Sequence, residues 1–167
     1  VYQHDFDGTI PGPEGNGHPL LAPFGIFPAH DGQVAIGIVD DVFWNELTKC
    51  MGDEALAEDK RFSTRSARKE NSQTVNALVS SWTKQKTKNK LLNILGGKLP
   101  FGPVNTIKDI FNDKHVNVRK MIVSVPHHNS TKRDWKVAAN PIKFSLNPAP
   151  KAITPPKIGE HNEKYLG

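Results

Sequence analysis

The chain has 167 residues, a formal net charge of +5, a hydrophobic content of 37% and a charged content of 23%. A chain of this length buries about 70% of its unfolded surface, so we expect a folded protein of domain size. No apolar run approaches the roughly 18 residues of a membrane span, which favours a soluble protein without a membrane partner. The single cysteine, Cys50, excludes an internal disulfide framework and Cys-rich zinc sites, and fits a reducing compartment.

The first 28 residues contain many glycines and prolines, and they predict a connector with few regular hydrogen bonds. The turn dipeptide Asp31-Gly32 then precedes residues 33–39, in which Val34, Ile36 and Ile38 alternate with small or polar residues. This period of two predicts a strand with one well-covered face.

A helix should follow, with Asp40 or Asp41 as its N-cap and Gly52 just past its end. Its apolar residues recur at helical spacing and form one stripe, which consists of Phe43, Leu47, Cys50 and Met51. Because Cys50 belongs to this stripe, a core role is favoured over that of a nucleophile.

Three further helices are predicted from their caps and apolar faces. Ser66 would cap the first, Thr87 the second, and Thr106 with Asp109 would form a capping box at the start of a short third one. The second helix should end at the glycine pair 96–97. The inner faces of the first two consist of Val75, Leu78, Val79 and Trp82, and of Leu91, Leu92 and Leu95.

Residues 120–125 and 134–139 alternate as strands and predict an antiparallel pair joined by a polar loop. We expect both in one sheet with residues 33–39, extended at its edge by Ile142 and Phe144. The prolines between residues 147 and 156 favour an extended strap. The fold class is therefore α+β, a small domain with a mainly antiparallel sheet, covering helices and extended straps.

The charges are distributed unevenly along the chain. Residues 1–59 hold eleven acids and one base, a net charge of −10, and residues 60–167 hold twenty-one bases and six acids, a net charge of +15. A basic surface of this kind can attract an anionic partner. The lysines are scattered without interleaved aromatic residues, however, which favours a solvated surface and no nucleic-acid partner. A non-catalytic basic interaction module stays an alternative.

Catalytic and metal-binding motifs are absent from the sequence. There is no Gly-x-Ser-x-Gly elbow, no His-Glu-x-x-His helix and no Gly-x-Gly-x-x-Gly after a strand, so we assign no catalytic residue and no metal site. His18 and His30 could contact a ligand or bond to the backbone. The chain lacks an initiator methionine and closes at Gly167 as a helix begins, so we expect a piece of a longer protein.

Several motifs in the same order resemble the C-terminal half of family III coenzyme A transferases, of the formyl-CoA and carnitine CoA-transferase type. The earlier ones are Gly17-His18-Pro19, Ala22-Pro23-Phe24-Gly25-Ile26-Phe27, Asp31-Gly32, Trp44, Arg61-Phe62 and residues 68–71. The later ones are Gly102-Pro103-Val104-Asn105-Thr106, Arg119-Lys120-Met121 and residues 141–145 and 155–161. The resemblance covers nearly the whole chain.

The resemblance implies an interlocked homodimer of two-domain subunits. Residues 1–28 would be the connector from a missing N-terminal Rossmann-like domain, residues 29–140 the small α+β domain, and residues 141–167 an extended strap returning to the large domain. The enzyme would be cytoplasmic, or mitochondrial or peroxisomal in a eukaryote.

The resemblance also implies the chemistry. An aspartate attacks an acyl-CoA thioester and passes coenzyme A to a carboxylic acid, with no permanently bound cofactor. That aspartate lies in the N-terminal half, so this chain alone should be inactive. The substrate-binding candidates are Gly15, Gly17 and His18, where oxalate-using relatives carry consecutive glycines; the oxalate type is therefore disfavoured. An α-methylacyl-CoA racemase-like isomerase is the alternative within the fold.

Overall fold

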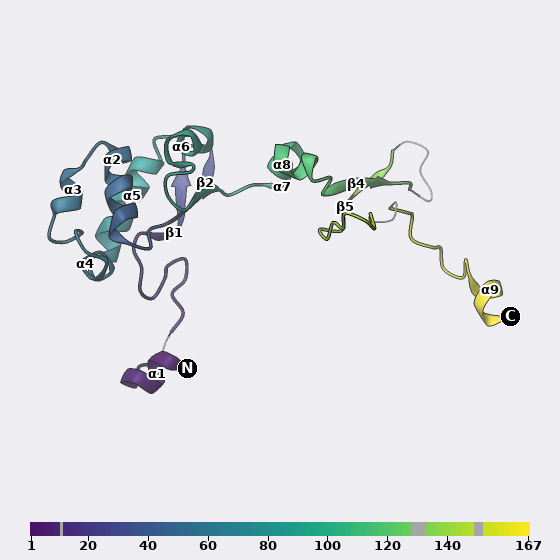
Figure 1. Cartoon of the computed structure of the whole chain (residues 1–167), viewed down its shortest axis with the longest axis horizontal. Helices are drawn as coiled ribbons and strands as arrows, with labels where there is room; N and C mark the ends of the chain where they lie inside the picture. Colours follow the sequence, from purple (N-terminus) through teal and green to yellow (C-terminus); the bar gives the residue numbers. More distant parts are fainter. Residues whose placement is uncertain (11, 128–132, 149–151) are drawn as a thin grey trace. The chain divides into compact units, whose positions relative to one another are not determined.

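Short helices and antiparallel strands make up the secondary structure of the chain (Figure 1). A computed structural model describes residues 1–10, 12–127, 133–148 and 152–167. These residues form two compact units, unit 1 (Val1–Val104) and unit 2 (Asn105–Gly167).

The helices and strands have the following bounds. Unit 1 contains α1 (Tyr2–Asp7), β1 (Phe24–Ala29), β2 (Gly32–Gly37), α2 (Asp41–Met51), α3 (Ala55–Glu58), α4 (Arg65–Glu70), α5 (Ser72–Thr83), α6 (Lys88–Leu95) and β3 (Phe101–Pro103). Unit 2 contains α7 (Ile107–Asn112), α8 (Lys114–Val118), β4 (Ile122–Val125), β5 (Trp135–Ala138) and α9 (Asn162–Leu166).

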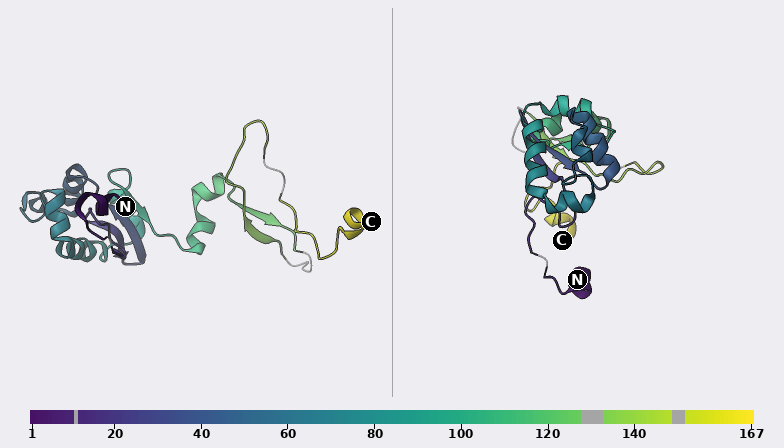
Figure 2. Two further views of the ribbon diagram at one scale, coloured as in Figure 1. Left: turned by 90° about the horizontal axis from the view of Figure 1, so that it is seen from below. Right: turned by 90° about the vertical axis from the view of Figure 1, so that its left-hand side faces the viewer.

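A three-stranded antiparallel sheet in the order β1-β2-β3 is the centre of unit 1. Strands β1 and β2 form a hairpin in which Ala29 pairs with Gly32 across the two-residue turn His30-Asp31. The predicted strand is confirmed with shifted bounds, because it begins at Gly32 and ends at Gly37 instead of spanning residues 33–39. Short strand β3 pairs with the other edge of β2, from Val34↔Pro103 to Ile36↔Phe101. Helices α2 and α5 lie on the same side of this sheet (Figures 1 and 2).

The expectation of irregular structure throughout residues 1–28 is wrong at both ends of that segment. Helix α1 occupies its start, and β1 begins at Phe24. Strand β1 shows no alternation in the sequence because apolar residues point to both of its faces. Pro28 is tolerated there because β1 is an edge strand and need not donate a hydrogen bond on both sides.

The expectation of one sheet is also wrong. Strands β4 and β5 pair with each other, from Ile122↔Ala138 to Val125↔Trp135, in a separate two-stranded sheet of unit 2. Ile142 and Phe144 lie outside any strand and do not extend it. The predicted antiparallel pair itself is confirmed; residues 128–132 of its loop lie outside the described part of the chain.

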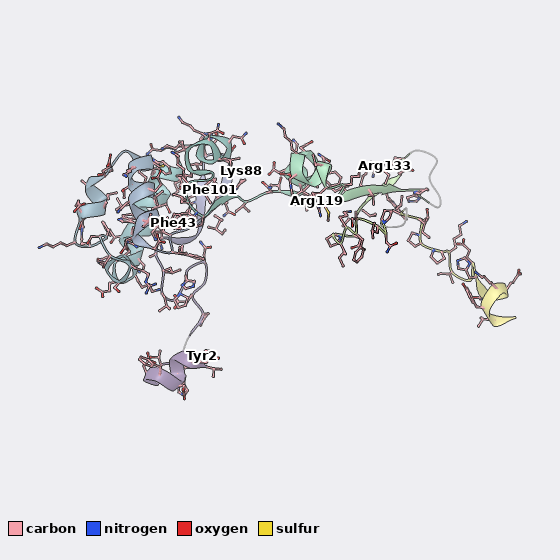
Figure 3. The ribbon with its side chains drawn as sticks, in the orientation of Figure 1. Tyr2, Phe43, Lys88, Phe101, Arg119 and Arg133 are labelled. Carbon is pink, nitrogen blue, oxygen red and sulfur yellow. The ribbon has the colours of Figure 1, made fainter. Side chains whose placement is uncertain are left out.

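The hydrophobic core of unit 1 lies between the sheet and the helices. The sheet side contributes Phe27, Val34, Ile36 and Ile38, and the helices contribute Trp44, Leu47, Val75, Val79, Leu91 and Leu95. Phe43 and Phe101 are partly buried against this core (Figure 3), as is Cys50, in agreement with its predicted core role. Each fully buried side chain of this size contributes about 1.5 to 3 kcal/mol.

Most of the predicted helix ends are confirmed. Asp40 accepts from the Phe43 amide, Thr87 accepts from the Lys90 amide, and Thr106 with Asp109 forms a capping box. Gly52 is the left-handed C-cap of α2. The predicted cap Ser66 is wrong, because the cap lies two residues earlier, at Thr64. A break at Asn71 also divides the predicted helix into α4 and α5.

The guanidinium of Arg68 is fully buried and joins three segments of unit 1. Its Nε donates to the Ala22 carbonyl at 3.2 Å, one terminal nitrogen donates to Phe62 O at 2.9 Å, and the other donates to Asp40 O at 3.4 Å and to the Asp41 carboxylate at 2.8 Å. The same guanidinium lies 5.4 Å from the ring centroid of Trp44.

Unit 2 has a much smaller interior. Among its described residues, Val125 is the one buried apolar side chain. Large apolar residues that stay exposed include Ile142, Phe144, Leu146, Ile153 and Ile158. Both hairpin strands therefore lack the cover that the sheet of unit 1 has.

We predict that Arg68→Ala lowers the free energy of unfolding by about 3 kcal/mol or more, because three backbone carbonyls lose their donor at ~1 to 3 kcal/mol each. Urea unfolding followed by circular dichroism measures this change. The control is Arg65→Ala on the same helix. Because the Arg65 side chain is exposed, its removal should change the free energy of unfolding by no more than ~0.5 kcal/mol. Equal effects of the two substitutions would contradict the structural role of Arg68.

Hydrogen exchange should separate the two units. Because β2 has a buried face and a partner strand on each side, its amides at Val34 and Ile36 should exchange at least about tenfold more slowly than those of Val123 and Val137 in the exposed hairpin. Mass spectrometry or NMR measures the rates. Similar protection in both sheets would show that the hairpin has cover that the structure does not describe.

Candidate functional site

The outer face of the unit 1 sheet carries a groove of about 450 Å³. Its floor is made of small residues from β2 and β3, namely Ala35, Gly37 and Gly102. Phe24 and Ile26 of β1 stand beside this floor, and the turn at residues 15–17 closes one side. Since Ala35 pairs with Ile26 and Gly37 pairs with Phe24, a small residue lies opposite each bulky one, and the floor stays open.

A tight turn brings Gly15 and Gly17 to the groove. The Gly17 amide donates to Glu14 O at 2.9 Å, and Gly15 has a φ of 60°, in the left-handed region. Gly25 of β1 has a φ of 146°, and a Cβ atom at this position would overlap the backbone oxygen of Asn16. The close approach of the turn to β1 therefore requires glycine at position 25.

Asn16 fixes the turn to the edge of β1. Its Nδ2 donates to Ile26 O at 2.8 Å, and its Oδ1 accepts from the Ile26 amide at 2.9 Å. One side-chain amide thus makes the pair of hydrogen bonds that a neighbouring strand would make. This pairing holds the turn in place without a further strand.

His18 lies directly behind the turn. Its ring centroid is 4.9 Å from that of Phe24, and its Nδ1 accepts from the Leu20 amide at 3.1 Å, which leaves the proton of a neutral ring on Nε2. Lys69 donates to His18 O at 2.9 Å and lies 3.4 Å from the Glu14 carboxylate. The turn is therefore also anchored to α4.

The three predicted substrate-binding residues lie together. Gly15 and Gly17 line the groove, while His18 contacts its Phe24 wall. His30, the other histidine considered, lies in the β1–β2 turn and is absent from the groove lining. No residue that lines the groove is charged, so the groove offers an apolar surface and backbone groups to a ligand.

Sequence reasoning missed Asn16 and the floor of the groove. The signal for the floor was present, because Ala35 and Gly37 occupy the outward positions of the predicted strand and leave space above it. No signal in the sequence identified the pairing between Asn16 and Ile26. This pairing is a tertiary hydrogen bond between residues ten positions apart, and it forms only once the turn lies against β1.

Part of the basic surface is used within the fold. The Lys86 ammonium donates to Trp82 O at 3.1 Å and lies 4.2 Å from the Trp82 ring centroid. Burial lowers the pKa of Lys86, and the charge of nearby Lys90 lowers it further. Lys88 donates to Val104 O at 3.3 Å. These contacts fix the positions of two ammonium groups, and a hydrogen bond to a neutral carbonyl leaves their charge in place.

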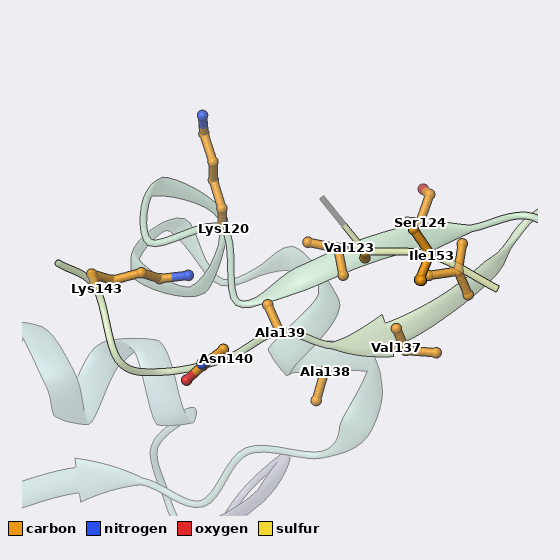
Figure 4. Close-up of a pocket in the computed structure, with 11 residues that line it drawn as sticks. Lys120, Val123, Ser124, Val137, Ala138, Ala139, Asn140, Lys143 and Ile153 are labelled. Carbon is orange, nitrogen blue, oxygen red and sulfur yellow. The ribbon is translucent and has the colours of Figure 1, made fainter. Parts of the chain in front are cut away.

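Unit 2 carries its own hollow, of about 780 Å³, between the hairpin and the segment that follows it. Val123, Val137 and Ile153 supply apolar walls, with Lys143 at one end (Figure 4). The side chain of Lys120 points away from the strands (Figure 4). The residues that line it include no carboxylate and no thiol.

Residues 1–10, 12–127, 133–148 and 152–167 contain no group of three or more His, Cys, Asp or Glu side chains that could hold a metal ion. No helix in these ranges is both long enough and apolar enough to cross a bilayer.

The sequence profile of CoA-transferase family III matches residues 1–162. The chain therefore belongs to CoA-transferase family III, which uses coenzyme A thioesters as substrates. It spans about a third to two fifths of the length of the curated relatives that it matches.

Two curated relatives illustrate the range of the family. The chain is 31% identical over 166 residues to the succinyl-CoA:mesaconate CoA-transferase of Haloarcula marismortui, covering 99% of this chain and 41% of that protein. It is 31% identical over 132 residues to the formyl-CoA:oxalate CoA-transferase of Streptomyces coelicolor, covering 78% of this chain and 32% of that protein.

A solved structure has the same fold. The crystal structure of a CaiB/BaiF family protein from Brucella suis superimposes with a TM-score of 0.80 at 30% identity, covering 99% of this chain and 42% of that one. The α+β fold with small antiparallel sheets and helices is thus a property of the family.

We predict that Gly25→Ala displaces the turn from β1. The strained backbone and the overlap with Asn16 should cost about 1 to 3 kcal/mol of unfolding free energy. The Ile26 amide, which Asn16 protects, should exchange faster. Gly102→Ala is the matched control, since a Cβ there meets no atom within 4 Å. Unchanged exchange at Ile26 in Gly25→Ala would contradict the argument.

Proposed function

We propose that this chain is the C-terminal part of an enzyme that moves coenzyme A from an acyl-CoA donor to a carboxylic acid. The aspartate that attacks the thioester lies outside these 167 residues. In this step an aspartate oxygen bonds to the acyl carbon, the carbon–sulfur bond breaks, and coenzyme A leaves as its thiolate. Membership of the family is the observation that carries the proposal.

The groove supports a role for unit 1 beside this chemistry. An uncharged, partly apolar surface closed by a tight turn can exclude water, and a mixed anhydride needs that protection from hydrolysis. We assign substrate contact to the turn residues Gly15 and Gly17, and to His18 beside them. No catalytic residue and no bound cofactor are assigned to the chain.

Transfer is preferred to racemisation because the relatives described above are named as CoA-transferases. Among transferases, the turn reads Gly15-Asn16-Gly17-His18 in place of consecutive glycines, which supports an acceptor other than oxalate. The basic interaction module is disfavoured, because the CoA-transferase family profile matches residues 1–162. The working enzyme is proposed to be a cytoplasmic homodimer.

The test is expression of the complete reading frame that encodes this chain, with the 167-residue chain alone beside it. The long protein should transfer coenzyme A from succinyl-CoA to at least one acid of a panel. Borohydride should trap an aspartyl thioester, which forms when the released coenzyme A thiolate attacks the aspartyl carbon of the mixed anhydride and the donor carboxylate leaves. The chain alone should give no turnover, because it lacks the nucleophile. Turnover by the purified chain, or an unrelated upstream sequence, would refute the proposal.

Within the long protein we predict that His18→Ala lowers kcat/KM by about 10- to 100-fold, since the ring supports the groove wall at Phe24 and a displaced wall misplaces substrate. His30→Ala is the control and should leave kcat/KM unchanged, because His30 lies in the β1–β2 turn and makes no ring contact with the Phe24 wall. Steady-state kinetics with one donor and one acceptor measures both. Equal losses would show that His18 has no special role.

A further inference from the structure

Among the described residues of unit 1, one buried side-chain oxygen has no hydrogen-bond partner. The Oδ1 oxygen of Asn76 makes no hydrogen bond within the described parts of the chain. Asn76 lies on α5, one turn before Ser80, and both residues line a cavity of about 180 Å³. The other residues that line this cavity are Asn16, Gly17, Phe24, Ile26 and Phe27. The cavity therefore lies where the turn, β1 and α5 meet.

An acceptor without a donor is unusual in a folded protein, because buried polar groups are almost always hydrogen-bonded to protein or to another molecule. Asn76 already forms part of the cavity wall. The terminal torsion of an asparagine side chain is broad, so the oxygen can turn into the cavity without a movement of α5. The cavity exceeds the volume of one water molecule and can receive a short polar group at the end of a ligand.

The residues that line the cavity define which ligand group it can accept. None of the seven residues is charged, so a carboxylate in the cavity would be buried without a counter-ion. A hydroxyl group can donate to the Asn76 oxygen and also accept from the Ser80 hydroxyl. Phe24, Ile26 and Phe27 provide apolar cover for the carbon atoms that carry it.

We propose that this cavity binds the hydroxyl-bearing arm of a short hydroxylated carboxylic acid, and that Asn76 determines the preference for the hydroxyl. The inference rests on the proposed function, since the acid would be a substrate of the transfer. The carboxylate of the acid stays outside the cavity. The turn that contacts the groove also forms part of this cavity, so one turn contacts both parts of the site.

Three probes test the proposal on the 15N-labelled 167-residue chain by NMR titration. They are 4-hydroxybutyrate, butyrate and succinate, which place a hydroxyl, a methyl and a carboxylate at the same end. The first should shift the Asn76 side-chain amide signals and bind about fivefold or more tightly than butyrate, the value of one net hydrogen bond. Succinate should bind more weakly than either.

Asn76→Leu should abolish the preference for 4-hydroxybutyrate, whereas Asn93→Leu, at an exposed position on α6, should keep it. Ser80→Ala removes one oxygen from the same cavity and should reduce the preference for 4-hydroxybutyrate over butyrate. If Asn76→Leu does not fold, an unchanged preference in Ser80→Ala overturns the proposal. Equal affinity of the wild type for 4-hydroxybutyrate and butyrate, or a preference retained in Asn76→Leu, overturns the proposal. No acyl-CoA is present, so a failure of CoA transfer in the long protein would leave this result unaffected.

Discussion

The buried guanidinium of Arg68 is the interaction on which unit 1 depends. It donates to the backbone carbonyls of Ala22, Asp40 and Phe62, which lie in three different loops. The hydrophobic effect is non-directional and would not by itself fix the positions of these loops relative to one another. Burying an arginine is costly unless its donors are used, and here the planar fork reaches several acceptors at once. The entry to β1, the start of α2 and the loop before α4 therefore adopt their positions together. The groove depends on the same contacts, because the Ala22 carbonyl lies just before Phe24.

The elements with local signals could be predicted from the sequence. Caps at Asp40, Thr87 and Thr106 act within one helical turn, and the alternation around Val34 reflects one buried face. Strand partners could not be predicted in the same way, because pairing joins distant residues. The hydrophobic pattern of β2 does not distinguish β1 from β4 as its neighbour, and β1 has apolar residues on both faces.

Only the part of the candidate site that has a local sequence motif, the turn at residues 15–17, could be proposed from the sequence. A motif resemblance located the turn, and the structure places its glycines on the groove. No pattern in the sequence indicates Asn76, since an asparagine on a helix is commonly a solvated residue. Its importance depends on an absent hydrogen bond, which is a property of three-dimensional packing. A site built from a turn, a strand edge and a helix is visible only once all three are assembled.

The pairing of Asn16 with Ile26 has a further consequence for the behaviour of the protein in concentrated solution. An open strand edge is a template onto which the strand of another molecule can add, and proteins that leave such edges free tend to aggregate. At the middle of β1 the amide of Asn16 occupies both backbone groups that an incoming strand would need. The turn that borders the groove thus also terminates the sheet, so a substitution that frees this turn would open a route to intermolecular β-structure.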